Sequence, residues 1–298
     1  MTCPNNELRV TRAVYGRSNR GSIVSFLRHG VVCITFLGFV AGSEALAQIS
    51  SINSAIIRPR VFNDIPGATG SYVNNYPGSI SLSESGVSQS TGFADRDVWY
   101  FSNDGGASPY QFQSGDYFSA SFTITLTGNN PNNKDLEAGW LFSNPGGTFG
   151  GDCQVIVTSS GVVAQFGGPS YYPFSPAAGG YPGAGGSVAN YTLGSTYTMG
   201  FIYTIDPNTG NPAFQYSVNG QYAASSPGNT YFDLAPGAFV GSPGDSLGGY
   251  LQIGNDPNNP SQSGTAVFGN ISITSVPEPS MLALLSVGIA SLLLRRRA

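Results

Sequence analysis

The sequence predicts an all-β fold, a two-sheet antiparallel sandwich of the jelly-roll type, with an N-terminal signal peptide before it and a single C-terminal hydrophobic helix after it. Short runs in which apolar and polar residues alternate recur along the chain, for example at residues 122–126 and 197–205. Loops rich in Asn, Gly and Pro separate these runs. Between residues 48 and 275 no window sustains the 3.6-residue period of an amphipathic helix.

The first 47 residues are expected to be a signal peptide with a long basic region at its start. An apolar stretch at residues 31–42 follows Arg28 and precedes Ala-Leu-Ala at 45–47. A basic segment, a short apolar stretch and an A-x-A site are together typical of export and of cleavage, here before Gln48. An uncleaved N-terminal anchor is the alternative interpretation.

Residues 48–275 are expected to form one β-sandwich domain, in which residues 116–274 give the best-supported strands. Two alternating runs flank Asn219-Gly220, a pair that predicts a type I′ hairpin because that turn needs positive φ at both central residues. Further strands are expected at residues 98–102, 138–142, 153–158, 161–166, 250–253 and 266–274.

The composition of this domain excludes several classes of function. Residues 48–275 hold four basic and thirteen acidic side chains, so their net charge is 4 − 13, or −9, and a phosphate backbone would be repelled. Nucleic acid is therefore not an expected partner. The only histidine of the chain, His29, lies in the expected signal peptide, which excludes a Ser-His-Asp triad or a histidine-ligated zinc site in the mature domain. Cys153 is the domain's only cysteine, and we expect it to be a buried apolar residue.

Residues 276–298 form a tail with three parts. Two prolines flank Glu278, an uncharged run follows at 281–294, and three arginines come next. As a helix the run would be roughly 21 Å long, short of the roughly 30 Å hydrocarbon core, which suits a transient anchor better than a permanent one. The arginines favour a cytoplasmic location for that end, whereas a C-terminal core helix is the alternative interpretation. The residues expected to carry the tail's function are Pro277, Glu278, Pro279, Arg295, Arg296 and Arg297.

This tail resembles the PEP-CTERM sorting signal of bacterial envelope proteins, which membrane proteases called exosortases recognise. The resemblance implies export, transient anchoring in the membrane through the C-terminal helix, processing by an exosortase, and a final location at the cell surface or outside the cell. Pro277, Glu278 and Pro279 would then be the residues that the exosortase recognises.

A second resemblance covers about half of the chain. Residues 116–274 resemble a concanavalin A-like jelly roll of the lectin/glucanase and laminin-G type. The segments that carry the resemblance are GDYFSASFTITLTG, EAGWLF, YTMGFIYT, AFQYSVNG, LQIGNDP and AVFGNISIT. It implies that the last strand pairs beside the first.

Acidic residues suited to catalysis are sparse. Glycosidases place two carboxyl groups about 5 to 9.5 Å apart, but the domain's glutamates are Glu84 and Glu137, far apart in sequence. Asp135 and Glu137 precede Trp140, whose indole offers a surface on which a sugar stacks; the alternative is that both acids solvate a turn. We therefore predict that the protein is not an enzyme. An atypical glycan-active enzyme, a glycosidase or a lyase, is the alternative.

Aromatic residues in a glycine- and proline-rich segment at 167–186 are the other candidate site. Tyrosine gives contact area at small entropic cost, so the segment is suited to binding a sugar or a protein; the alternative is that its rings cover the core. The candidate ligand-binding residues are Tyr171, Tyr172, Phe174, Tyr181 and Trp140.

No cofactor is expected, and a structural calcium ion stays open because calcium needs only oxygen ligands. The candidate ligands lie in turns, where Asx hydrogen bonds are the alternative role. They are Asp95, Asp97, Asp104, Asp233, Asp245, Asn255 and Asp256. No motif organises them into a defined ligand set.

Together these features predict an exported cell-surface or extracellular-matrix protein with a non-catalytic adhesion or carbohydrate-binding sandwich. Matrix polysaccharide is the expected partner of the domain, and the membrane and an exosortase are those of the tail. A purely structural role without a ligand stays open.

Overall fold

The fold is described from a computed structural model. The described residues are 49–62, 65–88, 92–113, 115–129, 136–143, 153–161, 163–167, 171–174, 190–226, 228–233 and 245–276. The expected signal peptide up to residue 47 and the tail from residue 277 lie outside them, as do Asp135 and Tyr181.

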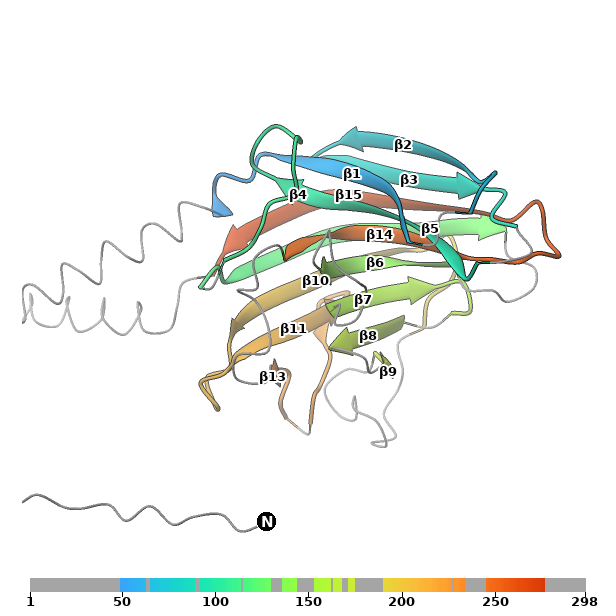
Figure 1. Cartoon of the computed structure of the whole chain (residues 1–298). Helices are drawn as coiled ribbons and strands as arrows, with labels where there is room; N and C mark the ends of the chain where they lie inside the picture. The colour runs from blue at the N-terminus through green and yellow to red at the C-terminus, as the bar shows by residue number, and fades with distance from the viewer. Residues whose placement is uncertain are drawn as a thin grey trace, which may run out of the picture.

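The described chain forms two antiparallel sheets that stack face to face (Figure 1), which confirms the predicted sandwich. Sheet A follows the order β1-β4-β14-β6-β7-β8-β9. Its strands are β1 (Ser54–Phe62), β4 (Ala94–Ser102), β14 (Ser246–Gly254), β6 (Leu136–Ser143), β7 (Cys153–Thr158), β8 (Val163–Gly167) and β9 (Tyr171–Pro173). Each pair of neighbouring strands in sheet A is antiparallel.

Sheet B follows the order β12-β11-β10-β5-β15-β3-β2, with β13 paired to β11. Its strands are β12 (Gln221–Tyr222), β11 (Pro212–Val218), β10 (Thr196–Ile205), β5 (Phe118–Asn129), β15 (Ser263–Ser275), β3 (Ser79–Ser85), β2 (Thr69–Asn75) and β13 (Phe232–Asp233). The last strand, β15, lies between β5 and β3 in sheet B, and β14 lies between β4 and β6 in sheet A. The last two strands therefore insert between earlier strands, one in each sheet.

The hairpin between β11 and β12 has the predicted turn. Asn219 and Gly220 have φ angles of 51° and 77°, the positive values that a type I′ turn requires. The side-chain Oδ1 of Asn219 also accepts a hydrogen bond from the backbone N–H of Thr198, which ties the turn to β10.

The two sheets differ in how their side chains are buried. In β5 buried residues alternate with partly exposed ones, because the even-numbered side chains face the core and the odd-numbered serines and threonines face solvent. In β4 all nine residues are buried, and β14 is buried along nearly its whole length. The central strands β4 and β14 of sheet A therefore bury side chains on both of their faces, whereas β5 of sheet B has one face in water.

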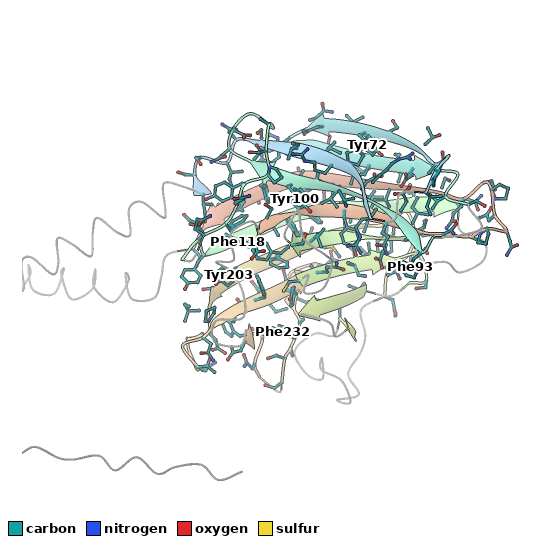
Figure 2. The ribbon with its side chains drawn as sticks, in the orientation of Figure 1. Tyr72, Phe93, Tyr100, Phe118, Tyr203 and Phe232 are labelled. Carbon is teal, nitrogen blue, oxygen red and sulfur yellow. The ribbon has the colours of Figure 1, made fainter. Side chains whose placement is uncertain are left out.

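The core between the sheets is strongly aromatic. Trp140 stacks on Phe122 with ring centroids 3.9 Å apart, and it lies 6.1 Å from Trp99. Its indole Nε1 donates a hydrogen bond to the backbone oxygen of Met199 across the sandwich, at 3.2 Å. Figure 2 shows Tyr72 and Phe232 at opposite edges of this layered body.

Candidate functional site

The outer face of sheet A carries a row of polar side chains. Because alternate residues of a strand point to opposite faces, Arg96 of β4 and Gln252 of β14 point away from the core that Trp99 and Leu251 occupy. The register places Gln252 directly opposite Arg96 on one side and Glu137 of β6 on the other. Three adjacent strands therefore contribute one residue each to this row.

These three side chains are joined by hydrogen bonds. Arg96 Nε donates to Gln252 Oε1 at 2.7 Å, and Gln252 Nε2 donates to Glu137 Oε1 at 2.6 Å. The Arg96 guanidinium also lies 4.0 Å from Glu137 Oε1. The orientation of the amide between the two charged groups is thus fixed from both sides.

Tyr250 of β14 lies at the centre of the arrangement. Its hydroxyl is 3.3 Å from Glu137 Oε1 and 3.1 Å from Oε1 of Gln154 on β7. Its ring lies 4.8 Å from the Arg96 guanidinium carbon, close enough for a cation–π contact. We call Arg96, Glu137, Gln154, Tyr250 and Gln252 the sheet A network.

Apolar side chains continue the same face beside the network. Val98, Leu141 and Ile156 form a small cluster with Tyr250, separate from the main core. Tyr250 is fully buried, and the relative exposure of Gln154, Gln252 and Arg96 is 7% each. Of the two charged residues, Glu137 has the more exposed side chain, with a relative exposure of 17% against 9% for Arg96.

A glycine in β6 is required beside this tyrosine. Gly139 is the register partner of Tyr250. A Cβ at position 139 would lie 2.0 Å from the carbonyl oxygen of Val155 in the neighbouring strand. Because this oxygen belongs to the backbone, a larger residue would push β6 and β7 apart and displace Gln154.

The network combines groups suited to holding a hydroxyl-rich ligand. It presents amide, guanidinium and carboxylate groups next to an aromatic ring across four adjacent strands, which lie about 4.8 Å apart. Among the outward-facing positions of β4, β6, β7 and β14 in the described residues, Glu137 is the single acid. The described residues of this face therefore supply one of the two carboxyl groups that glycoside hydrolysis needs.

Two of the predicted ligand-binding residues are in the core. Trp140 is fully buried between the sheets, so the expectation that its indole stacks on a sugar is not met by this structure, which uses it as a packing residue. Phe174 is also fully buried, as in the alternative interpretation of its segment. Tyr171 and Tyr172 lie in β9 at the edge of sheet A, and Tyr181 lies outside the described residues.

The candidate calcium ligands are spread over both ends of the sandwich. Asp104 accepts hydrogen bonds from Ser102 and Ser108, which together hold the pKa of its carboxyl well below the usual range. Asp256 Oδ1 accepts from the backbone N–H of Asn258, an Asx turn. Within the described residues no three acids, cysteines or histidines are grouped closely enough to hold a metal ion.

Sequence reasoning found Glu137 but missed the other four residues of the network. Arg96 lies within Asp95-Arg96-Asp97, where the aspartates drew attention as possible metal ligands. Gln154 and Gln252 are single polar residues inside apolar strands. Isolated polar residues in strands otherwise buried on both faces were the available signal.

Comparison with known proteins gives the class of the tail. Residues 275–297 match the PEP-CTERM protein-sorting motif. The chain therefore carries the sorting signal predicted from Pro277, Glu278, Pro279 and the terminal arginines. A search of curated proteins gave no match. Among the described residues there is no helix with the length and apolarity needed to cross a membrane.

Several solved structures are similar to the sandwich. A family 7 alginate lyase, A1-II′, is 11% identical with a TM-score of 0.42, over 69% of this chain and 82% of that chain. Alginate lyase PA1167 from Pseudomonas aeruginosa is 13% identical with a TM-score of 0.43, over 69% and 86%. The carbohydrate recognition domain of Emp46p is 10% identical with a TM-score of 0.39, over 70% and 86%. They assign no role to any residue of this chain.

Proposed function

We propose that the protein is an exported surface or matrix protein whose sandwich binds polysaccharide, without turnover, through the outer face of sheet A. The observation that carries the proposal is the sheet A network, in which a buried tyrosine, two glutamines and an arginine–glutamate pair converge from four strands. The PEP-CTERM motif supports the export.

Carbohydrate recognition explains why such groups lie on this face. Sugars present hydroxyl groups that both donate and accept hydrogen bonds, and the network offers both kinds of group next to an aromatic ring. A purely structural face would be expected to be apolar, because each buried polar group adds a desolvation cost that a hydrogen bond only offsets. Here the buried Gln252 makes two such bonds.

Glycan-active chemistry is the second candidate, and one observation favours it. The Tyr250 hydroxyl lies between a carboxylate and an amide, and the Arg96 guanidinium covers its ring. A tyrosine hydroxyl held in this way is a possible general acid or base in a lyase. A two-carboxylate glycosidase is not supported, since Glu137 has no second acid beside it on the described strands of this face.

The test measures binding and turnover on the same panel of neutral and acidic polysaccharides with the full-length protein. We expect Gln252→Ala to weaken retention about tenfold, because one buried hydrogen-bonding group is worth about 1.4 kcal/mol. Thr125→Ala, on the outer face of sheet B, is the matched control and is expected to bind normally. Unchanged retention by Gln252→Ala would refute the site, and depolymerisation lost in Tyr250→Phe would establish the enzyme instead.

We propose Tyr171, Tyr172 and Tyr181 as a second contact for matrix polysaccharide. Their place next to β8, at the edge of sheet A, supports this for the two residues in β9. Tyr171→Ala combined with Tyr172→Ala is expected to lower retention, and equal retention would remove the loop from the binding surface.

We further propose that an exosortase removes the tail after transient anchoring. The match at residues 275–297 supports this partner. Replacing both Pro277 and Pro279 by alanine is expected to leave an unprocessed chain that stays with the membrane. Mass spectrometry of the protein from cells checks both ends, and normal processing of this variant would contradict the assignment.

A further inference from the structure

Most edges of the two sheets are protected against pairing with another chain. In sheet A the edge strand β9 holds three residues and ends at Pro173, and in sheet B β12 and β13, which both pair with β11, hold two residues each. The other edge strand of sheet A, β1, is longer, but it contains Arg58, Pro59 and Arg60, and its register with β4 shifts after Arg58. Short length, charge, proline and irregular register are the usual protections of a sheet edge, because each hinders the addition of a further strand.

The remaining edge strand, β2 of sheet B, has none of these protections. Its seven residues, TGSYVNN at Thr69–Asn75, include neither a proline nor a charged side chain. It pairs with β3 over its whole length without a register shift, and no described strand lies on its other side, at the upper rim of the sandwich (Figure 1). None of the seven residues is buried. Among the described strands, β2 is therefore the edge that is open to pairing.

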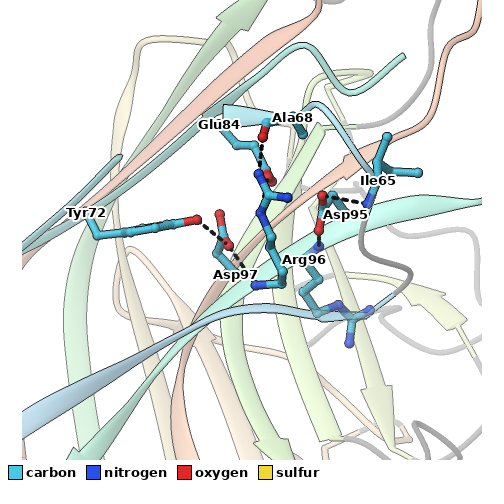
Figure 3. Close-up of polar contacts among 8 residues, drawn as sticks. Ile65, Ala68, Tyr72, Glu84, Asp95, Arg96 and Asp97 are labelled. Carbon is cyan, nitrogen blue, oxygen red and sulfur yellow. Dashed lines mark hydrogen bonds and ion pairs between the residues drawn. The ribbon is translucent and has the colours of Figure 1, made fainter. Parts of the chain in front are cut away.

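Side chains on the inner face of β2 hold this edge in place. The Tyr72 hydroxyl donates a hydrogen bond to Asp97 Oδ1 of β4 at 3.0 Å, beside the buried Glu84 (Figure 3). Asn74 Nδ2 donates to the backbone oxygen of Ala55 in β1 at 2.7 Å. Both contacts tie β2 to sheet A, so its free edge is already ordered and a partner strand would bind at little further entropic cost.

The side chains that a partner strand would meet are neutral, short and exposed. On the outer face of sheet B they are Thr69, Ser71, Val73 and Asn75. No residue from 65 to 83 carries a charge, although residues 48–275 have a net charge of 4 − 13, or −9. Two copies of the domain repel each other over most of their surface, but at β2 they can approach without facing like charges. A foreign peptide would instead need pockets for its alternate side chains, so these observations favour a second copy of the same neutral strand.

We propose that β2 pairs antiparallel with β2 of a second copy of this chain, so that the two B sheets join into one continuous sheet across a two-fold axis. Such a contact uses the same strand on both partners. When all seven residues pair, Tyr72 lies at the axis and Ser71 lies opposite Val73 of the second copy. Because the other described edges are protected, pairing ends at the dimer and does not continue into a fibre. The inference does not depend on polysaccharide binding, since association is measured with no polysaccharide present.

The first experiment measures the mass of the full-length protein in detergent by sedimentation velocity over a range of concentrations. We expect wild type to form a dimer as its concentration rises. Ser71→Lys combined with Val73→Lys places like charges opposite each other twice across the axis, and is expected to weaken dimerisation roughly tenfold. Both positions are exposed, so the variant is expected to fold. A wild type that stays monomeric, or a lysine variant that dimerises as well as wild type, would overturn the proposal.

The second experiment is a charge rescue, which separates lost pairing from lost folding. Ser71→Glu combined with Val73→Glu is also expected to dimerise weakly by itself. An equal mixture of the lysine and glutamate variants is expected to recover the dimer, because each introduced lysine then lies opposite an introduced glutamate. A mixture that stays monomeric would refute the pairing.

Val267→Lys is the matched control for both experiments. Val267 is 40% exposed on the outer face of sheet B, but it lies on β15, with β3 between it and β2. We expect this variant to dimerise like wild type. If it loses the dimer as fully as the β2 variant does, the contact lies on the face of sheet B and the assignment to its edge is wrong.

Discussion

The replacement of Trp140 by alanine tests whether this residue belongs to the core or to a sugar-binding surface. The indole is fully buried, stacks on Phe122 at 3.9 Å and donates a hydrogen bond to the Met199 backbone oxygen. Removing a buried aromatic side chain costs about 3 to 5 kcal/mol, and the orphaned carbonyl adds about 1 kcal/mol. The expected loss of about 4 to 6 kcal/mol is a large part of a typical domain's stability.

Denaturant unfolding followed by fluorescence measures this loss, because Trp99 is the other of the two tryptophans in the chain and remains as the reporter. Tyr222→Ala is the control: this side chain is 39% exposed on a two-residue strand, and its loss is expected to change stability by less than about 0.5 kcal/mol. If Trp140→Ala loses less than about 1 kcal/mol of stability yet no longer binds polysaccharide, the assignment of Trp140 to the core is wrong.

Three further changes test the strand pairing and the burial. Gly248→Ala is expected to cost about 3 kcal/mol in denaturant unfolding, because its Cβ would lie 1.7 Å from the Trp99 carbonyl oxygen; Gly200→Ala, which meets a movable serine hydroxyl, should cost far less. Asn219→Ala is expected to lose about 1 kcal/mol in thermal unfolding, since its φ is 51°, and a gain would exclude the type I′ turn. Cys153 is 1% exposed, so a thiol reagent should modify its peptide only after denaturation, and rapid native labelling would contradict its burial.

The strands of sheet B could be predicted from the sequence because one face of that sheet is in water. β5 and β10 show the period of two directly, with aromatic and aliphatic residues inward and, at most of the alternate positions, serine or threonine outward. The Asn219-Gly220 turn was predictable for a local reason, since Asn and Gly are the residues that most readily adopt the positive φ angles it needs. Trp140 was misassigned because a buried and an exposed indole look alike in sequence; the face toward which it points depends on the register of β6 with β14.

The sheet A network depends on pairings between strands that are distant in the chain. Gln252 meets Glu137 across 115 residues and Arg96 across 156 residues. These contacts exist because β14 inserts between β4 and β6, an order that local patterns do not specify. Burial on both faces of sheet A also removes the alternation that would mark polar positions, so Gln154 and Tyr250 could not be distinguished as site residues from their strands alone.

The Asp95-Arg96-Asp97 segment of β4 connects the two polar regions. Its pleat sends the aspartates inward to Glu84 and the arginine outward to Gln252. The backbone N–H of Arg96 donates to Asp95 Oδ1, so an inward-facing aspartate fixes the backbone from which the network's arginine extends. Because β4 lies between β1 and β14, this one segment links the edge strand of sheet A to the centre of the network.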